Sequence, residues 1–403
     1  MFSEDTMKVT LFKPNKFKAH SITGWLDINV LNNAFKKVKE NKGAPGVDNQ
    51  SIQEFRCDLR SRLISIIKRV RNKTYFPSPL RRTYVPKPNG KKRPLGIPTI
   101  RDRVLQESIR CIIEPLFEPQ FHDCSFGFRP GRSCHDAIDR IMLYKKLGYK
   151  FVVDADIVGC FDNIPFNIIM KALATTIADG NILTLIERFL NAGINYKGKF
   201  KESVKGTPQG GPASPLLCNI VLNAMDWQFD QAGYRFVRYA DDFVILCKSR
   251  QDAQEAYEFA GHILSLLGLE ISKEKSKITS FKDGFDFLGF RINNRGYKMK
   301  EDSVERFKHK IRDITTRCHN LDEHLIKKLQ QIAVGTVNYF GYSDAQVKTQ
   351  FKGFDEFIRR RIRCMKKKRI WHTDNWRIPN KRIYRWGIPS MVNLLSIKRA
   401  IPP

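Results

Sequence analysis

The sequence predicts an α+β protein built from amphipathic helices and short antiparallel strands. Apolar residues recur at helical spacing over several stretches, among them residues 103–117 and 253–267. Short runs of β-branched and aromatic residues lie between the helices, and turn-forming residues separate some of these runs in the manner of hairpins. At 403 residues the chain can bury a large core and should divide into two or three domains.

The composition favours a polyanionic partner. The chain has 71 Lys and Arg against 41 Asp and Glu, a formal charge of +30. Nucleic acid is favoured over a membrane because no apolar run is long enough to span a bilayer, although a merely soluble basic protein remains an alternative. The nine cysteines are odd in number and never spaced Cys-x-x-Cys, which favours neither a disulfide framework nor a zinc site. We therefore expect a reducing, cytoplasmic location, and Glu4 and Asp5 argue against a secretory signal.

The N-terminal part is predicted to be a basic extension over residues 1–28, followed by helices at 31–38 and about 51–70. Beyond them, Pro-Asn-Gly lies between two extended pieces in residues 84–98, which predicts a hairpin. Its two arms would carry Lys87 and Arg93, and this geometry suits a triphosphate. For this segment alone, a solvated basic hairpin explains the pattern equally well.

Acidic residues follow or interrupt two apolar, strand-forming runs. In Phe151–Asp156 the period of two places Asp154 and Asp156 on one face, so either could reach a metal ion. The stretch RFVRYADDFVILCK predicts a hairpin with Asp241 and Asp242 at its tip. Adjacent carboxylates near buried strands repel and lose solvation, so they are expected at a solvated turn or beside a cation. An ordinary acidic turn remains the alternative for this stretch alone.

A loop rich in glycine and proline, GTPQGGPASPLL at residues 206–217, lies between these two runs. Such a loop lets the backbone approach a ligand closely. The strand ending in Asp156, the loop and the hairpin together supply three carboxylates, which is what two divalent ions need for in-line phosphoryl transfer. Mg²⁺ suits such a site because it prefers oxygen ligands and keeps several waters.

The C-terminal region is more basic than the rest, because residues 301–403 carry 23 Lys and Arg against 10 Asp and Glu. Its apolar residues recur at helical spacing and predict a small helical bundle. A basic cluster follows with tryptophans nearby, which favours nucleic-acid contact over a merely solvated face. The residues of this basic cluster are Arg359, Arg360, Arg361, Arg363, Lys366, Lys367 and Lys368.

The ordered set of motifs resembles the palm of reverse transcriptases, in particular group II intron reverse transcriptase/maturases and their bacterial relatives. The resemblance covers about residues 30–395 and rests on GAPGVD, VPKPNGKKRPLGIPTIRDR, FGFRPGRS, DADIVGCFDNI, GTPQGGPASPLL, RYADD, GLEISKEKSKI and FLGFRI. It implies a right-hand polymerase, an RNA-directed DNA polymerase acting on an RNA template, a DNA primer and dNTPs. The implied parts are fingers at 29–150, a palm with a small antiparallel sheet at 151–295, and a basic helical thumb or maturase-like region at 296–403.

The resemblance also implies roles for individual residues. Phe161 matches the aromatic that blocks a ribose 2′-hydroxyl, although a core aromatic is the alternative, and Gln209 matches the residue along the incoming nucleotide. Lys87 and Arg93 match the cations on its triphosphate. The implied catalytic and metal-binding residues, for two Mg²⁺ ions that Mn²⁺ can replace, are Asp156, Asp241 and Asp242.

The chain also departs from the intron enzymes that it resembles. Thr336 stands where that family usually has Trp, the segment between Trp371 and Trp386 is shortened, and Pro212-Ala213 replaces an apolar pair. These departures put intron splicing and mobility in doubt without touching polymerase chemistry. The RNA template is therefore either an intron RNA or a dedicated noncoding RNA, as in stand-alone relatives that include antiviral defence enzymes.

Two other functions remain open at this point. One is an RNA-binding maturase or ribonucleoprotein scaffold with secondary polymerase activity, against which the intact carboxylates argue. The other is an RNA-templated RNA polymerase, which Phe161 disfavours on steric grounds. Neither the priming mode nor the oligomeric state follows from the sequence.

Overall fold

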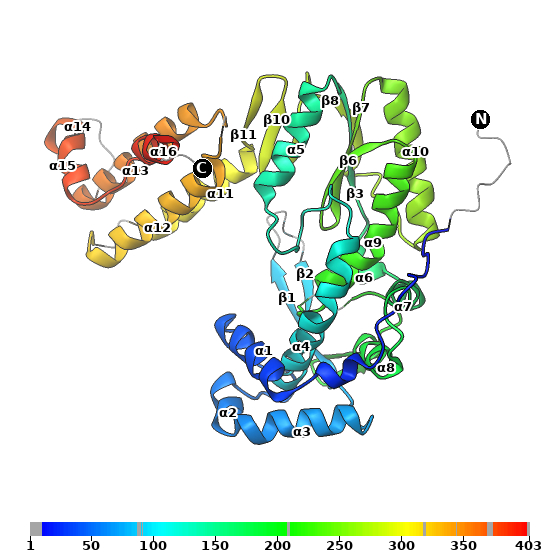
Figure 1. Ribbon diagram of the computed structural model, residues 1–403. Coiled ribbons are helices and arrows are strands. Elements are labelled where there is room, and N and C mark those ends of the chain that lie inside the picture. Colours follow the sequence, from blue (N-terminus) through cyan, green and yellow to red (C-terminus); the bar gives the residue numbers. More distant parts are fainter. Residues whose placement is uncertain are drawn as a thin grey trace. The chain divides into compact units, whose positions relative to one another are not determined.

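The computed structural model describes residues 10–86, 90, 92–207, 210–316, 320–343, 345–368 and 374–400, without the side chains of residues 374 and 375. The chain divides into two compact units, unit 1 up to Ile278 and unit 2 from Thr279 onward. Both units combine helices with antiparallel strands, so the predicted α+β class is confirmed (Figure 1). Among the described residues, no helix has the length and apolar character needed to cross a membrane.

The first helices of unit 1 begin at polar caps. Asp27 accepts a hydrogen bond from the Val30 amide, and Ser51 forms a capping box with Glu54. The single helix predicted over about 51–70 is wrong, because the backbone of Asp58 is not helical (φ −128°, ψ 41°) and separates two helices. These first elements are η1 (Ile22–Trp25), α1 (Ile28–Glu40), α2 (Ile52–Cys57), α3 (Leu59–Arg71), α4 (Ile100–Phe117), η2 (Glu118–Gln120) and α5 (Cys134–Lys146).

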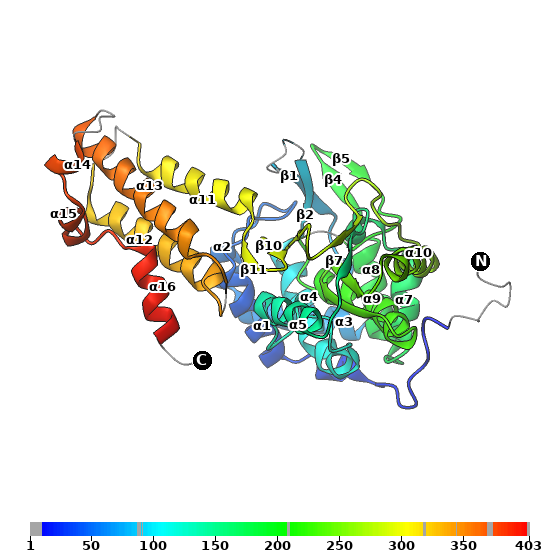
Figure 2. The same cartoon turned by 90° about the horizontal axis from the view of Figure 1, so that it is seen from above.

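One four-stranded sheet of unit 1 has the order β2-β1-β4-β5. Its strands are β1 (Leu80–Pro86), β2 (Lys92–Ile97), β4 (Ile194–Tyr196) and β5 (Lys199–Lys201). Strands β1 and β2 pair antiparallel from Arg81 opposite Ile97 to Pro86 opposite Lys92, which confirms the predicted hairpin. Strand β4 pairs parallel to β1, and Figure 2 shows β4 and β5 beside it.

The second four-stranded sheet of unit 1 has the order β6-β7-β3-β8. Its inner strands, β7 and β3, have buried centres, with Val152, Val153 and Val244 at 0% exposure. Helices α5, α9 and α10 pack against it (Figure 1), so the carboxylates at its strand ends rest on a rigid, apolar base. The elements of this part are β3 (Phe151–Asp156), α6 (Cys160–Asn163), α7 (Phe166–Ala174), α8 (Gly180–Leu190), α9 (Ser214–Gln231), β6 (Arg235–Tyr239), β7 (Asp242–Cys247), α10 (Arg250–Leu266) and β8 (Lys277–Ser280).

Unit 2 begins with a three-stranded antiparallel sheet and continues as helices (Figure 2). The predicted helical bundle is confirmed: α11, α12, α13 and α16 pack together, with Phe307 stacked on Phe354 at 4.2 Å between ring centroids. Its elements are β9 (Phe285–Phe287), β10 (Phe290–Asn293), β11 (Gly296–Met299), α11 (Glu301–Ile314), α12 (Glu323–Phe340), α13 (Lys348–Lys367), α14 (Asp374–Arg377), α15 (Asn380–Arg385) and α16 (Met391–Ala400).

Candidate active site

The predicted acidic hairpin forms between β6 and β7. Tyr239 pairs with Asp242 at its end, and Ala240 and Asp241 make the turn, with Ala240 in the left-handed region at φ 58°. Strand β7 also pairs with β3, and there Asp242 lies directly opposite Asp156. Two carboxylates far apart in the sequence therefore face each other across adjacent strands, with Asp241 next to them.

Burial and crowding raise the pKa values of Asp241 and Asp242. Burial raises the pKa of Asp241, and the nearby Asp156 raises it further, while Arg93 and Lys275 oppose that rise. Burial, followed by the charges of Asp241 and Asp156, raises the pKa of Asp242 to about 6. The site thus holds more negative charge than its neighbouring cations compensate, which favours binding of additional cations.

Lys275 is the nearest cation to Asp156, and sequence reasoning assigned it no role. Its Nζ lies 2.6 Å from Oδ2 of Asp156, while its side chain remains 65% exposed. The same segment fixes the end of β3, because the Asp156 amide donates to Ser276 Oγ and the Asp156 carbonyl accepts from the Ser272 amide. Ser272, Lys275 and Ser276 all belong to the motif GLEISKEKSKI. That motif was the sequence signal from which their role could have been predicted.

The donor set fits a divalent cation, although it is not arranged as a finished site. Among the described residues, no group of three His, Cys, Asp or Glu side chains already has the arrangement of a metal site. Lys275 supplies the positive charge beside Asp156 that a metal ion would supply, and its exposed side chain can leave without disturbing the core. Asp154 is engaged differently, since it lies 3.8 Å from Lys277 and pairs across the sheet with Val244.

A buried ion pair supports the turn from below. Arg238 and Asp226 are both 0% exposed and lie 2.5 Å apart. Arg238 also donates from Nη1 to the carbonyl of Ala240 and to Asn219 Oδ1, and Asn219 donates to the carbonyl of Gly127. The network therefore joins the turn at Asp241 to helix α9 and to the FGFRPGRS loop. Sequence reasoning missed it, because the arginine of RYADD looks like any strand residue.

A pocket of about 840 Å³ opens in front of the carboxylates. Asp156, Asp241 and Asp242 line it, together with Arg93 from β2 and the half-buried Phe161 from α6. The structure therefore brings five of the predicted catalytic and nucleotide-binding residues to one cavity. The other two predicted residues of this set, Lys87 and Gln209, lie outside the described residues.

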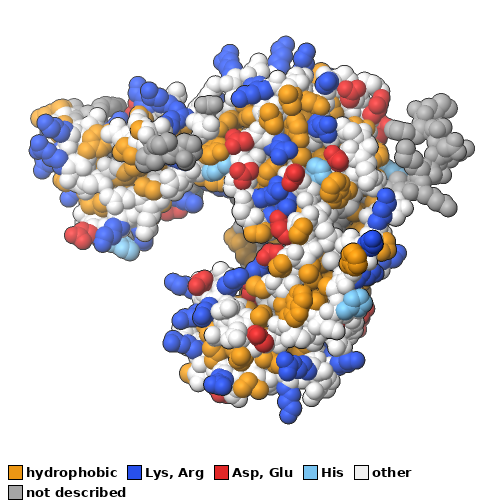
Figure 3. Space-filling model, viewed as in Figure 1, with side chains coloured by type: hydrophobic (Ala, Val, Ile, Leu, Met, Phe, Trp, Pro, Cys, Tyr) orange, Lys and Arg blue, Asp and Glu red, His pale blue; other side chains and the backbone are white. Residues whose placement is uncertain are grey.

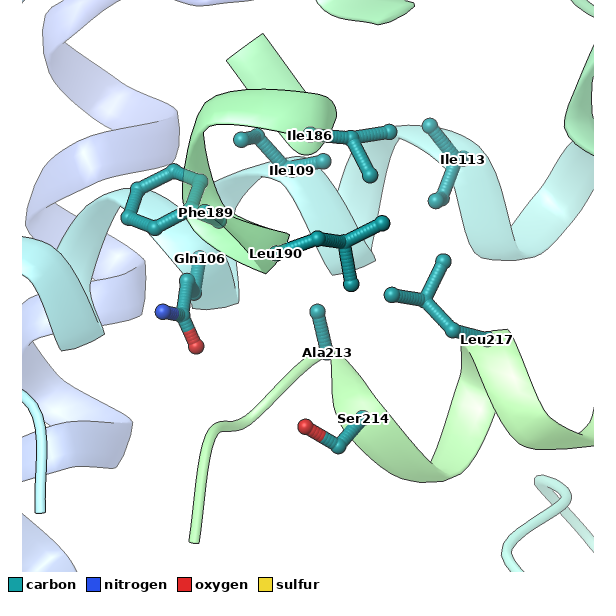
Figure 4. A pocket seen from close by; sticks show the side chains of 9 residues that line it. All are labelled: Gln106, Ile109, Ile113, Ile186, Phe189, Leu190, Ala213, Ser214 and Leu217. Carbon is teal, nitrogen blue, oxygen red and sulfur yellow. The ribbon is translucent and has the colours of Figure 1, made fainter. Parts of the chain in front are cut away.

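The Gly-Pro-rich loop closes one side of this pocket. Gly206 has φ 89°, and a Cβ there would lie 2.6 Å from the carbonyl oxygen of Asp162. Gly206 therefore requires glycine, whereas a Cβ on Gly211 would meet the flexible end of the Gln106 side chain at 2.6 Å. Behind the loop, the start of α9 packs on apolar side chains of α4 and α8, where Leu217 and Ala213 face residues such as Ile109 and Leu190 (Figure 4).

The basic cluster of unit 2 has two kinds of member. Arg363 is buried and donates to the Ile378 carbonyl and to Asn380, while Arg361 donates to Thr315. These two arginines hold unit 2 together. Arg360 and the three lysines that end the cluster are exposed, and Arg359 is partly exposed. Figure 3 shows Lys and Arg side chains over the visible surface of this unit and over α1–α3 of unit 1.

The antiparallel sheet, its paired aspartates and the pocket before them define the class of right-hand nucleic-acid polymerases. Family comparison agrees and is more specific. Residues 85–292 match the family model "Reverse transcriptase (RNA-dependent DNA polymerase)", and residues 304–385 match "Group II intron, maturase-specific domain". The chain therefore belongs to the reverse transcriptase family, as the motifs predicted.

Individual relatives extend this result. Protein YkfC of Escherichia coli (strain K12) is 35% identical over 293 residues, which cover 62% of this chain and 77% of YkfC. The group II intron-encoded protein LtrA of Lactococcus lactis subsp. cremoris is 33% identical over 330 residues, 65% of this chain. The matched region spans only 54% of LtrA. In the solved partial Cas6-RT-Cas1--Cas2 complex, one chain aligns with 62% of this chain and 41% of its own length, at 24% identity and a TM-score of 0.40.

Proposed function

We propose that this reverse transcriptase extends a DNA primer on an RNA template by nucleotidyl transfer at Asp156, Asp241 and Asp242. The observation that carries the proposal is the register of β3 and β7, which sets Asp156 opposite Asp242 beside the turn that bears Asp241. The pKa values of Asp241 and Asp242 are raised, and these carboxylates gain stability when cations bind beside them.

These three carboxylates would hold two divalent ions, which we take to be Mg²⁺, with Mn²⁺ able to replace them. When bound, such ions lower the pKa of the primer 3′-hydroxyl and neutralise charge on the triphosphate. Asp156 must first release Lys275, which is then free to pair with an anionic group of the substrate. Arg93, which also lines the pocket, together with Lys87, would bind the triphosphate and the leaving pyrophosphate.

Phe161 would select deoxyribonucleotides. It lies in α6, directly after β3, and lines the same pocket as the carboxylates. Its carbonyl accepts a hydrogen bond from the Thr207 amide, so the ring is carried on a segment tied to the Gly-Pro-rich loop. A rigid aromatic at this place excludes a 2′-hydroxyl by its bulk, which favours a DNA product over an RNA product.

The biological role that we propose has two forms. A maturase-specific match and an intron-encoded relative support intron mobility. The alternative form is a stand-alone enzyme with a dedicated noncoding RNA, defence included, and the 77% coverage of YkfC supports only the shorter length of such an enzyme. A scaffold with secondary polymerase activity is disfavoured, because uncompensated carboxylates cost stability and folding does not require them. The eight described cysteines are all free, in keeping with a cytoplasmic enzyme.

Primer extension tests the chemistry. Asp241→Asn should lower extension by about 10³-fold or more, because a metal ligand is lost, while binding of a primer–template duplex stays near that of the wild type. Asp230→Asn is the matched control, since Asp230 is an exposed carboxylate on α9. Near-normal extension by Asp241→Asn would overturn the assignment. Sequencing of the RNA that copurifies from the native host separates an intron from a short dedicated template.

A further inference from the structure

Phe128, in the FGFRPGRS loop, presents an exposed aromatic residue to the active-site pocket. It lines the pocket that Asp241 and Asp242 also line, and it is 56% exposed. Its backbone is in the left-handed region, with φ 56°. Among the described residues that line this pocket, Phe128 is the only one other than glycine with a positive φ. A bulky residue in this region is strained, so the surrounding structure must hold it there.

The residue before Phe128 is fixed to the turn that bears Asp241. A Cβ on Gly127 would lie 2.4 Å from the Ala240 amide nitrogen, so this part of the loop packs directly on that turn. The Gly127 carbonyl also accepts a hydrogen bond from Asn219 of α9. The backbone of the loop therefore cannot move independently of the Asp241 turn.

The residue after Phe128 is also held firmly. The Arg129 side chain is 3% exposed and donates hydrogen bonds to Glu118 and to two backbone carbonyls. Its guanidinium lies 5.2 Å from the centre of the Phe121 ring. Among the described residues, the Phe128 ring has no aromatic or cationic partner of this kind. The loop thus fixes the backbone of Phe128 and leaves its ring available to a ligand.

The residues proposed to bind the incoming nucleotide belong to a different part of the pocket wall. The Gly-Pro-rich loop donates a hydrogen bond to the Phe161 carbonyl. A Cβ on Gly210 of that loop would lie 2.7 Å from a carbonyl oxygen of β2, the strand that bears Arg93. Phe128 is instead attached to the Asp241 turn. If the nucleotide lies beside Arg93 and Phe161, the primer end must reach the carboxylates from the remaining part of the pocket, and Phe128 belongs to that part.

We propose that the Phe128 ring packs against the sugar of the primer's 3′-terminal nucleotide and positions its 3′-hydroxyl beside the carboxylates. The terminal base pairs with the template and stacks on its neighbour, so its sugar is left to contact an apolar ring. An uncharged aromatic ring suits the C–H face of a deoxyribose better than it suits a phosphate. This inference rests on the proposed polymerase function and adds a positioning residue to it.

Photocrosslinking tests this contact without requiring synthesis. The full chain, with p-benzoylphenylalanine in place of Phe128, is bound to a primer–template duplex and irradiated, and the crosslinked nucleotide is mapped. We expect the crosslink at the 3′-terminal nucleotide of the primer. The same replacement at Phe17, which is 83% exposed and does not line the pocket, is the control and should give no crosslink there. A crosslink confined to the template strand or to the 5′ part of the primer, or none at all, would overturn the proposal.

Kinetics and stability together separate a positioning role from a structural one. Phe128→Ala should lower kcat by about 10–100-fold, because a misplaced hydroxyl reacts slowly, and should leave KM for dNTPs unchanged. Phe128→Tyr keeps the ring and should retain a kcat near that of the wild type. Phe128→Gly removes the ring and relieves the left-handed strain, so its kcat should also fall while its Tm does not. A Tm that fell in Phe128→Gly, or an unchanged kcat in Phe128→Ala, would contradict the proposal.

This contact and the polymerase chemistry can fail separately. If the wild type extended no primer but position 128 still crosslinked to the primer terminus, the polymerase proposal would fail and the contact would stand. If the wild type extended primers normally and the crosslink lay elsewhere, the polymerase proposal would stand and Phe128 would not position the primer.

Discussion

Unit 1 contains two four-stranded sheets that differ in the sign and the burial of their charged residues. In β6-β7-β3-β8 the inner strands are buried and acidic residues cluster where strands end, as with Asp156 opposite Asp242. In β2-β1-β4-β5 the strands carry six cations and no acids, and β5 is fully exposed. The first sheet can hold like charges close together because its core is rigid. The second can keep Lys92, Arg93, Lys199 and Lys201 because these side chains are exposed and water solvates them.

The two sheets therefore contribute differently to stability. Buried charge in the acidic sheet requires dedicated partners such as the Arg238–Asp226 pair, and the pKa values of Asp241 and Asp242 are raised. Exposed cations on the basic sheet lower the stability of the fold little, and they contribute mainly to the free energy of binding an anion. Substitutions in the acidic sheet should consequently change folding, and those in the basic sheet should change binding.

The largest effect that we expect is at the buried pair. Asp226→Asn leaves Arg238 without its counter-charge in an interior that excludes water, and should lower the free energy of unfolding by about 3–5 kcal/mol. Denaturant titration of the purified protein measures this. Asp230→Asn, on the same helix but 40% exposed and 3.8 Å from Arg235, should cost less than about 1 kcal/mol. Similar losses for both variants would contradict the contrast between buried and exposed charge.

On the basic sheet, Arg93→Gln should act on substrate and leave folding unchanged. Losing one charged contact to the triphosphate should lower kcat/KM for dNTPs by about 10–100-fold, mainly through KM. Steady-state primer extension with varied dNTP is the measurement. Arg82→Gln is the control, because Arg82 belongs to the neighbouring strand β1 and does not line the pocket. A similar rise in KM for both would show that only general positive charge matters.

Phe161→Ala tests selection at the boundary between the two sheets. Removing the ring makes room for a 2′-hydroxyl, so the preference for dNTPs over rNTPs should fall by about tenfold or more. Competition between labelled dNTP and rNTP in single-nucleotide extension measures it. Phe200→Ala removes an exposed ring that does not line the pocket and should leave the preference unchanged. Unaltered selectivity in Phe161→Ala would make this residue a packing aromatic.

The smallest effect concerns pH. Folded Asp242 keeps its proton up to about pH 6, whereas the unfolded chain releases it near 3.8. The folded state therefore binds more protons in that window, and metal-free stability should fall as pH rises through it. Asp242→Asn cannot ionise and therefore does not lose stability in this way. Above about pH 6, with a chelator present to keep the site free of metal, the Tm of this variant should exceed that of the wild type. The difference should vanish below 3.8. A wild-type Tm that rose through the window would contradict the raised pKa.

Much of the site could be predicted because its parts are local in sequence. A turn between two β-forming runs predicts the hairpin at Asp241. The alternation of side chains along β3 indicates Asp154 and Asp156 as candidate metal ligands, without choosing between them. The break at Asp58 was missed, because helical periodicity continues across it. The spacing of apolar residues shows which side chains could share a helix face. A single kink in the backbone leaves that spacing unchanged, so the kink cannot be read from it.

The sequence by itself determined the class of fold and the order of the motifs, since strands, turns and helical faces follow from short-range periodicity, and the resemblance carried by those motifs pointed to three carboxylates. Only the tertiary structure decided that Asp156 faces Asp242, that Lys275 pairs with Asp156, and that Arg238 is buried. It also separated the internal Arg363 from exposed neighbours in the same basic cluster. The physical reason is that a charge's partner and its access to water depend on which distant segments pack around it.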